Sequence, residues 1–345
     1  MRALVNLSVR SEDVAPPSAA AAPFHRALDG YAATPLRALS PTVALKDESA
    51  RLGLPAFKVL GASWAVERAL REASGVHTLV TASTGNHGRA VAWSAARRGL
   101  ACRVFLPSRS VAARRDAIAG EGAELVVVEG VYEDAVAAAR SAGEAEGVME
   151  IADVGSSGPA GWVIDGYATL FAEVADSGRE FDVVFVPVGV GALAAAAARF
   201  AATTTHPPMK VIGVEPVTAA CLTASLAAGE PTVTPSAGTT MAGLDCAEVS
   251  PAAWPSLRDG VHGMVTVRDA EAHAAMRELA AAGLQIGDSG ASTLAALRAL
   301  ASEDEGCAEL RQAVGLGPES RVLLIGTEGA TDPEGYRQRV PVNQP

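Results

Sequence analysis

One lysine of this 345-residue chain lies in a setting suited to covalent chemistry. Lys58 stands in residues 57–63 (FKVLGAS), at the head of a predicted helix, and is one of only three lysines among 28 Lys and Arg residues. An ammonium in apolar surroundings loses hydration and its pKa falls, so the free amine can form a Schiff base with an aldehyde. The alternative is a lysine whose stem packs on the core and whose head reaches solvent. Three further loops favour the first interpretation.

The first of these loops, residues 83–88 (STGNHG), joins a predicted strand to a predicted helix. Free amides at a helix N-terminus can hold a carboxylate, and Asn86 offers a side-chain donor to a ring oxygen. The expected substrate contacts are Ser83, Thr84, Gly85 and His87. An ordinary helix cap is the alternative interpretation.

The second loop, residues 188–193 (VGVGAL), again follows a strand and precedes a helix. Small residues let backbone amides approach a phosphate, and the helix dipole favours its negative charge. A dinucleotide fingerprint would have a third glycine and an acidic residue about 20 positions on, and both are missing. A monophosphate is therefore the better ligand. The residues expected to hold it are Gly189, Val190, Gly191, Ala192 and Leu193.

The third loop, residues 326–329 (GTEG), also lies at a strand's end, where the Thr327 hydroxyl could meet a ring nitrogen. Residues 287–291 (GDSGA) are expected to line the same cleft. Each loop has an ordinary turn or cap as its alternative. Because loops at the carboxyl ends of strands converge on the ligand in an open α/β sheet, the set points to one site.

The elements that position these loops alternate along the chain. We expect strands near 42–47, 76–81, 101–106, 124–128, 148–151, 182–186, 210–214, 264–267 and 322–325, with helices between them. Such alternation predicts mostly parallel sheets covered by helices on both faces. Residues 1–30 are expected to form a surface arm, residues 216–260 to be less regular, and residues from 339 onward to form a loose tail.

Composition limits the function. With 49% hydrophobic and 19% charged residues, no long apolar run and no secretory signal, we expect a soluble cytoplasmic protein of two unequal domains. The four cysteines form no CxxC pair, which argues against a zinc site and a disulfide framework. A net charge of −11 disfavours nucleic acid and anionic membranes as partners.

Together these motifs resemble the fold type II pyridoxal-phosphate enzymes, the tryptophan synthase β family, from about residue 34 to 337. The resemblance implies a two-domain, three-layer parallel-sheet α/β fold, with a large cofactor-binding domain (1–76 and 154–345) and a smaller mobile domain (77–153). It also implies a homodimer. Pyridoxal 5'-phosphate would be held by Lys58 as a Schiff base, by Asn86 at the phenolic oxygen, by the loop from Gly189 to Leu193 at the phosphate, and by Thr327 at the pyridine nitrogen.

Within that family the chain resembles the diaminopropionate ammonia-lyases. The strings that carry this resemblance are KDES (46–49), FKVLG (57–61), GNHGR (85–89), DGYATL (165–170), MAGL (241–244) and TEG (327–329). Asp153 matches a second active-site carboxylate of those enzymes. Thr84 departs from the pattern, because those enzymes have an aspartate there that is associated with the D-isomer and the β-amino group.

The resemblance implies α,β-elimination on a small amino acid with a β-leaving group, giving an α-keto acid and ammonia. Lys58 would take the α-proton, and Asp153 would protonate or orient the leaving group. The alternatives are a serine or threonine type of dehydratase, which Thr84 makes more credible, and a β-replacement synthase of secondary metabolism. A cofactor-binding protein without turnover is a fourth hypothesis, against which Lys58 and the asparagine loop count.

Overall fold

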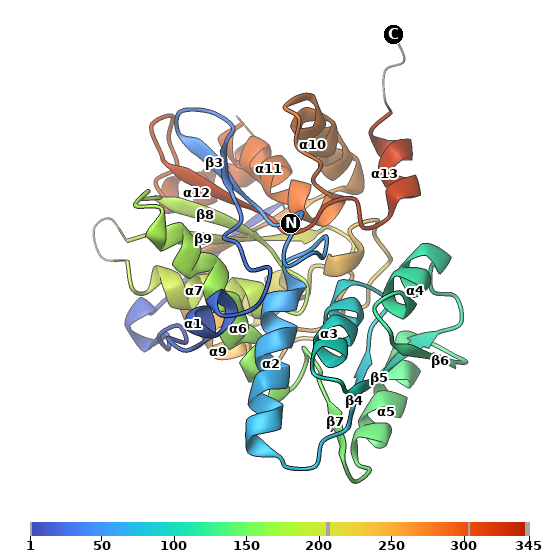
Figure 1. Ribbon diagram of the computed structural model, residues 1–345. Helices are drawn as coiled ribbons and strands as arrows, with labels where there is room; N and C mark the ends of the chain where they lie inside the picture. The colour runs from blue at the N-terminus through green and yellow to red at the C-terminus, as the bar shows by residue number, and fades with distance from the viewer. Residues whose placement is uncertain (1, 205–207, 303, 342–345) are drawn as a thin grey trace.

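Two separate β-sheets organise the chain (Figure 1). The computed structural model describes residues 2–204, 208–302 and 304–341. The larger sheet has the order β1-β10-β9-β8-β11-β3-β2, and the smaller has the order β6-β5-β4-β7. All pairs are parallel except β1 with β10 and β2 with β3, at the two edges of the larger sheet. The prediction of mostly parallel sheets is confirmed.

The strands of the larger sheet are β1 (Ala3–Val5), β2 (Leu36–Ala38), β3 (Val43–Asp47), β8 (Val183–Pro187), β9 (Lys210–Pro216), β10 (Gly263–Val267) and β11 (Val322–Gly326). Those of the smaller sheet are β4 (Thr78–Ala82), β5 (Ala101–Pro107), β6 (Glu124–Val128) and β7 (Val148–Glu150). Every residue of β8, β10 and β11 is buried. Their continuous apolar sequences therefore match strands covered on both faces.

Thirteen α-helices lie within the described residues: α1 (Ala21–Arg26), α2 (Lys58–Glu72), α3 (Asn86–Arg97), α4 (Ala112–Ala119), α5 (Tyr132–Gly143), α6 (Pro159–Asp176), α7 (Ala192–Ala201), α8 (Cys221–Ala228), α9 (Trp254–Gly260), α10 (Asp269–Ala281), α11 (Asp288–Ala301), α12 (Glu305–Ala313) and α13 (Pro333–Arg339). Two short 3-10 helices are η1 (Ser11–Asp13) and η2 (Ala242–Leu244).

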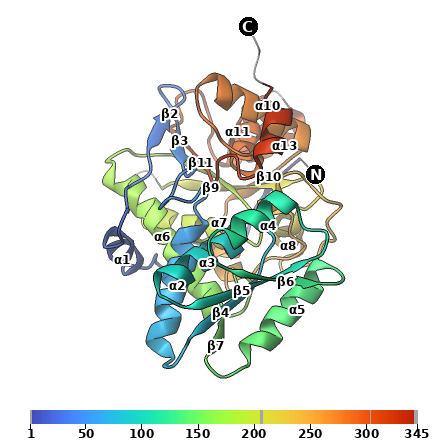
Figure 2. The ribbon, with the colours of Figure 1, turned by 45° about the vertical axis from the view of Figure 1, so that its right-hand side comes forward.

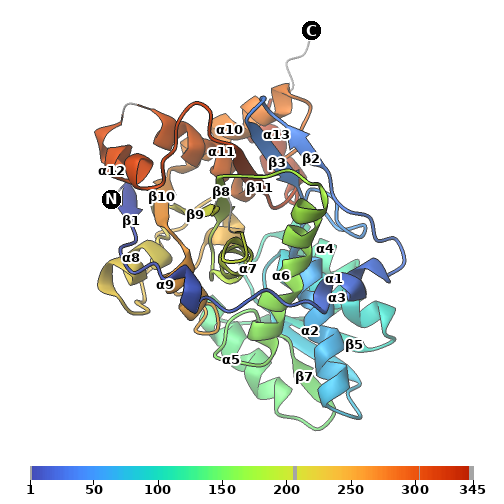
Figure 3. The same ribbon diagram turned by 90° about the vertical axis from the view of Figure 1, so that its left-hand side faces the viewer.

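The helices cover the larger sheet on both faces, and strand β8 shows why. Its alternate residues Val184 and Val186 belong to the core cluster that includes α7, whereas Val183 and Phe185 belong to the cluster that includes α11. Successive side chains of a strand point to opposite faces, so α7 and α11 lie on opposite sides (Figure 3).

Helix α2 connects the two sheets, because it packs against α6 on one side and α3 on the other. Helices α3, α4 and α5 surround the smaller sheet (Figure 2). Glycines allow α2 and α6 to pack closely: a Cβ at Gly61 would lie 2.6 Å from the Tyr167 ring, and one at Gly166 would collide with the Leu60 carbonyl oxygen. This contact fixes the axis of the helix that begins with Lys58.

Some sequence expectations were wrong. The segment 1–30 is more than a surface arm, because β1 is an edge strand of the larger sheet and His25 on α1 is fully buried. Residues 216–260 contain α8 and α9 as well as loops. The predicted loose tail begins at the last residue of α13, and residues 342–345 lie outside the described part of the chain.

None of the helices in residues 2–204, 208–302 and 304–341 combines the length and the apolar character that crossing a membrane would require.

Candidate active site

The segment that leads to Lys58 is fastened to the loop after β11. Phe57 donates its backbone N–H to the Thr327 carbonyl at 3.1 Å, Gly329 donates to the Pro55 carbonyl at 2.9 Å, and Ala56 forms an isolated antiparallel bridge with Glu328. The structure thereby brings the lysine loop and the Thr327 loop together, as the sequence predicted for loops at strand ends.

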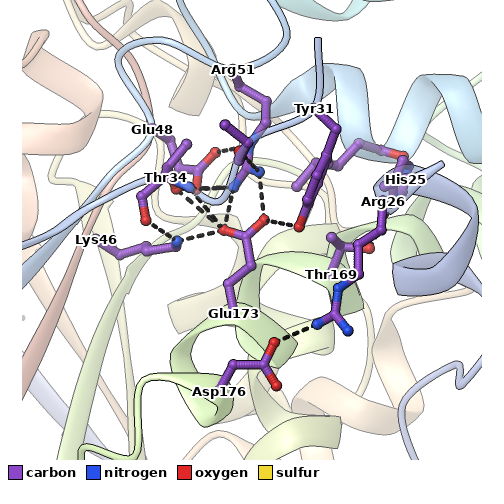
Figure 4. A network of polar contacts seen from close by, with 12 residues as sticks. His25, Arg26, Tyr31, Thr34, Lys46, Glu48, Arg51, Thr169, Glu173 and Asp176 are labelled. Atoms are coloured by element: carbon purple, nitrogen blue, oxygen red, sulfur yellow. Dashed lines mark hydrogen bonds and ion pairs between the residues drawn. The ribbon is translucent and has the colours of Figure 1, made fainter. Parts of the chain in front are cut away.

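A buried ionic network holds the stretch of chain just before this segment (Figure 4). Arg51 donates hydrogen bonds to Glu48 and to Glu173, at 2.6 Å each, and Lys46 donates to Glu173 at 2.5 Å. All four side chains are at most 2% exposed. The network joins β3 and the turn after it to α6, so it fixes the path of the chain toward Lys58.

Lys58 forms an ion pair with Asp153, with 2.9 Å between Nζ and Oδ2, and each side chain is less than one-fifth exposed. Burial alone lowers the pKa of Lys58, but Tyr167 and Asp153 outweigh it and raise that pKa. The expected lowering of the Lys58 pKa is therefore wrong for this arrangement. Burial would raise the pKa of Asp153, but Lys58 and His87 outweigh it and hold that pKa well below its usual range.

His87 lies beside this pair. Its Nε2 is 2.9 Å from the Ile151 carbonyl oxygen, which only accepts, so Nε2 carries the proton. Its Nδ1 is 3.9 Å from Asp153 Oδ2 and has no hydrogen-bond partner within the described residues. Burial is the main cause that lowers the pKa of His87, and Lys58 adds to it. A neutral imidazole thus presents a lone pair toward the carboxylate.

The loop 83–88 runs from β4 into α3, as predicted. Asn86 and His87 are the first two residues of α3, and the Gly85 amide donates to Ser83 Oγ at 3.2 Å. A Cβ at Gly88 would lie 3.0 Å from both Ser83 Cβ and Val104 Cγ1. Thr84 is half-buried. The loop therefore presents the helix N-terminus toward the Lys58 and Asp153 pair, from the smaller sheet.

The loop from Val188 to Gly191 carries the chain from β8 into α7 without room for larger side chains. Gly191 has a φ of +91°, and a Cβ there would lie 2.5 Å from Leu257 Cδ1. A Cβ at Gly189 would lie 2.5 Å from the Gly243 carbonyl oxygen. Ala192 and Leu193 form the buried first turn of α7. The result is a backbone cradle at a helix N-terminus, which suits a phosphate.

Thr327 has a buried hydroxyl with no partner among the described residues, and the residue is 4% exposed. Buried polar groups in native proteins almost always have a partner, so this hydroxyl fits a ligand atom such as a ring nitrogen. The predicted neighbour, loop 287–291, is indeed adjacent, because a Cβ at Gly290 would lie 2.8 Å from the Thr327 nitrogen.

Four residues of this region were missed by sequence reasoning. Tyr132 at the start of α5 donates its hydroxyl to the Ala82 carbonyl at 3.1 Å, and Asp153 helps to raise its pKa after burial, the main cause. Tyr167 is fully buried, its hydroxyl has no hydrogen-bond partner among the described residues, and burial raises its pKa to about 12. Cys246 has its Sγ 3.1 Å from the position of a Cβ on Gly189, and Glu328 accepts a hydrogen bond from Asn86.

The sequence of this chain is similar to that of known enzymes. The family model "Pyridoxal-phosphate dependent enzyme" matches residues 27–327. Diaminopropionate ammonia-lyase of Escherichia coli K12 is 33% identical over 356 residues, which cover 92% of this chain and 89% of that enzyme. The biosynthetic L-threonine dehydratase of the same organism is 32% identical over 223 residues, covering 65% of this chain and 42% of the dehydratase.

A solved structure agrees with the sequence comparison. The Escherichia coli diaminopropionate ammonia lyase in complex with an aminoacrylate-PLP azomethine reaction intermediate superposes with a TM-score of 0.88, at 30% sequence identity. The superposition covers 98% of this chain and 96% of that one. The same enzyme in complex with D-serine gives the same values.

Proposed function

Because this chain belongs to the family of pyridoxal-phosphate dependent enzymes, we propose that it is an ammonia-lyase that eliminates the β-substituent of a small amino acid. The fold is that of the fold type II enzymes, and the cofactor is pyridoxal 5'-phosphate. The named candidate substrate is 2,3-diaminopropionate, with an α-keto acid and ammonia as products. The observation that carries the proposal is the contact of Lys58 with Asp153, which sets the amine expected to hold the cofactor beside a second ionisable group.

The residues present fit the cofactor. Lys58 is the amine that would hold its aldehyde, Asn86 would meet the ring oxygen, and Thr327 would meet the ring nitrogen. The loop formed by Gly189, Val190, Gly191, Ala192 and Leu193 would hold the phosphate. Two observations support this assignment: the cradle leaves no space for a Cβ at Gly189 or Gly191, and the Thr327 hydroxyl has no protein partner in the described residues.

Each chemical role falls on a residue of this chain. Pyridoxal phosphate, when bound, supplies the electron sink that makes the α-proton acidic. The free amine of Lys58 would take that proton and become an ammonium. Asp153, an ionised carboxylate beside Lys58, would orient the leaving β-group, and the proton that Lys58 has taken would pass to that group. His87 lies beside Asp153, with its Nδ1 3.9 Å from Oδ2. Ser83, Thr84, Gly85 and His87 would surround the substrate carboxylate.

A second candidate, a serine or threonine type of dehydratase, is favoured by one residue. Thr84 stands where the diaminopropionate enzymes have an aspartate, so a group that would recognise a β-amino substituent is missing. A β-replacement synthase is the other alternative. Both would use Lys58 in the same way, and they differ from the main proposal in the leaving group and in the fate of the product.

We further propose that the enzyme is a cytoplasmic homodimer in which residues 77–153 form a smaller mobile domain against 1–76 and 154–345. The four free cysteines are in keeping with a reducing compartment. Helix α2, packed between α6 and α3, is the natural hinge of such a motion. Light scattering of the purified protein tests the dimer, and hydrogen exchange with and without substrate tests the mobile domain.

The function is tested by turnover of a substrate panel. Keto-acid release is measured with D- and L-2,3-diaminopropionate, L-serine and L-threonine, and the visible absorption of the bound cofactor is followed with each. We expect the highest kcat/KM with L-2,3-diaminopropionate, and no turnover in Lys58→Ala. Lys210→Ala, which removes a lysine on β9 away from the site, is the matched control and should keep wild-type activity. Wild-type rates in Lys58→Ala would refute the proposal.

A further inference from the structure

The carboxylate of Glu328 joins the two sheets at the candidate active site. Glu328 follows β11 of the larger sheet, and its Oε2 accepts a hydrogen bond from Nδ2 of Asn86, the first residue of α3 in the smaller sheet unit. Glu328 is only 6% exposed. Glu328 belongs to the TEG string (327–329), but the sequence alone assigns it no role, since it reads as the middle of a turn between Thr327 and Gly329.

The backbone and neighbours of Glu328 leave its side chain little freedom. Its carbonyl accepts the Gly287 amide at 2.9 Å, and Ala56 pairs with it as an isolated bridge. A Cβ on Gly287 would lie 3.1 Å from Glu328 Cγ, so the side chain packs directly on that glycine. The carboxylate is therefore held at a fixed place from which it reaches Asn86.

Burial and neighbouring charges determine the pKa of the Glu328 carboxyl group. Burial is the main cause that raises the pKa of Glu328, and the Asp288 carboxylate adds to it. Ser289, Arg114 and Asn86 act in the opposite direction. A buried carboxyl group without partners is costly, so the hydrogen bond from Asn86 is important for keeping Glu328 at this position.

We propose that Glu328 is a positioning residue that orients the Asn86 carboxamide for the cofactor, an inference that rests on the proposed function. A carboxamide nitrogen has two hydrogens, and an acceptor on one side decides which end of the amide is the nitrogen. Glu328 takes one hydrogen of Nδ2. The second hydrogen is then available to the ring oxygen of pyridoxal phosphate, and the amide cannot flip without losing its acceptor.

The test measures cofactor affinity rather than turnover. Apoprotein of the full chain is titrated with pyridoxal phosphate, and Kd and the absorption maximum are recorded for Glu328→Ala, Glu328→Gln, Asn86→Ala and the double variant Glu328→Ala with Asn86→Ala. Glu319→Gln, at an exposed position, is the control and should match wild type. Thermal unfolding of each apoprotein verifies that it is folded.

We expect Glu328→Ala to raise Kd by about tenfold, the scale of one hydrogen bond to a charged group. Glu328→Gln keeps an acceptor oxygen and should remain within about threefold of wild type. Because Glu328 acts through Asn86, the double variant should bind no more weakly than Asn86→Ala alone. If Glu328→Ala fails to fold, Glu328→Asp replaces it, since its carboxylate is one methylene shorter.

Three results would overturn the inference: an unchanged Kd and spectrum in Glu328→Ala, a Glu328→Gln variant as weak as the alanine variant, or losses that multiply in the double variant. These readouts do not depend on the substrate. A wild type that binds pyridoxal phosphate without eliminating from any amino acid would refute the proposed function and leave the test of Glu328 intact.

Discussion

The resemblance to the diaminopropionate ammonia-lyases predicts a departure at Thr84, where an aspartate is expected in those enzymes. A threonine hydroxyl is far too weak an acid to be deprotonated near neutral pH, so it cannot act as a base. An aspartate is ionised at that pH and can take a proton from the face opposite Lys58. We therefore expect wild-type activity on D-2,3-diaminopropionate to be lower than on the L-isomer by about 100-fold or more, the scale of a general base.

The variant Thr84→Asp should recover part of the D-isomer activity with little change for the L-isomer, whose α-proton faces Lys58. Steady-state keto-acid release with both isomers, L-serine and L-threonine measures this. Efficient wild-type turnover of the D-isomer would contradict the stereochemical argument. Activity confined to L-serine or L-threonine would favour the dehydratase.

At the scale of single residues, the sequence could indicate Lys58, because three further loops at strand ends accompany the lysine at its apolar helix start. It could not indicate the state of that lysine. The raised pKa of Lys58 depends on Tyr167 and on Asp153, whose Oδ2 lies 2.9 Å from Nζ, and both residues are distant from Lys58 in the sequence. Tyr167 was equally hidden, since its place is set by the absent side chain of Gly61.

At the scale of elements, the connection between β8 and α7 contains both a glycine with positive φ and the proposed phosphate site. Gly191→Asp places a side chain at a φ of +91° against Leu257 and adds a negative charge at the N-terminus of α7, beside the expected phosphate site. We expect pyridoxal-phosphate retention after dialysis to fall, with Kd raised at least roughly tenfold. Gly283→Asp is the matched control, since Gly283 has a φ of +78° and an open surrounding. Equal cofactor content in both variants would place the phosphate elsewhere.

The ionic network between β3 and α6 makes a second prediction for an element. Glu173→Ala leaves Lys46 and Arg51 buried without their shared carboxylate, so the free energy of unfolding should fall by about 3–5 kcal/mol. Asp176→Ala removes an exposed carboxylate one turn further along α6, whose pair with Arg26 is worth at most about 1 kcal/mol. Urea unfolding of both variants measures the difference, and equal losses would contradict a special role for the network.

Most strands and helices could be predicted, because each has a local apolar pattern that survives without its neighbours. The ionic network could not, since Lys46, Glu48 and Arg51 look like an exposed charged turn until Glu173 of α6 reaches them. Helix α1 was missed for the same reason. Its fully buried residues are Ala21 and His25, and the groups that satisfy the histidine belong to α2 and α6.

At the scale of the whole molecule, His25 links the N-terminal segment to the helix that carries Lys58. Its Nε2 lies 2.9 Å from the Leu60 carbonyl oxygen, and its Nδ1 lies 2.6 Å from Thr169 Oγ1. The carbonyl can only accept, so Nε2 carries the proton and Nδ1 accepts from Thr169. The imidazole is therefore neutral, and both of its ring nitrogens have a hydrogen-bond partner.

Burial is the main cause that lowers the pKa of His25 from 6.5 to about 4. Between these values the unfolded chain binds a proton that the folded chain does not, so stability is present above pH 6.5 and is lost as the pH falls toward 4. One pKa unit corresponds to about 1.4 kcal/mol, so this residue alone should remove roughly 3 kcal/mol over that range.

We expect the free energy of unfolding of the wild type to fall more steeply between pH 6.5 and 4 than that of His25→Gln, which has no imidazole to protonate. The variant should be less stable at pH 7.5, because it loses the packing and hydrogen bonds of the imidazole ring. The difference in free energy of unfolding between wild type and variant should narrow as the pH falls. Chemical unfolding at a series of pH values measures both curves. His77→Gln, at an exposed histidine, is the control and should run parallel to the wild type. Parallel curves for wild type and His25→Gln would show that His25 does not link the N-terminal helix to acid stability.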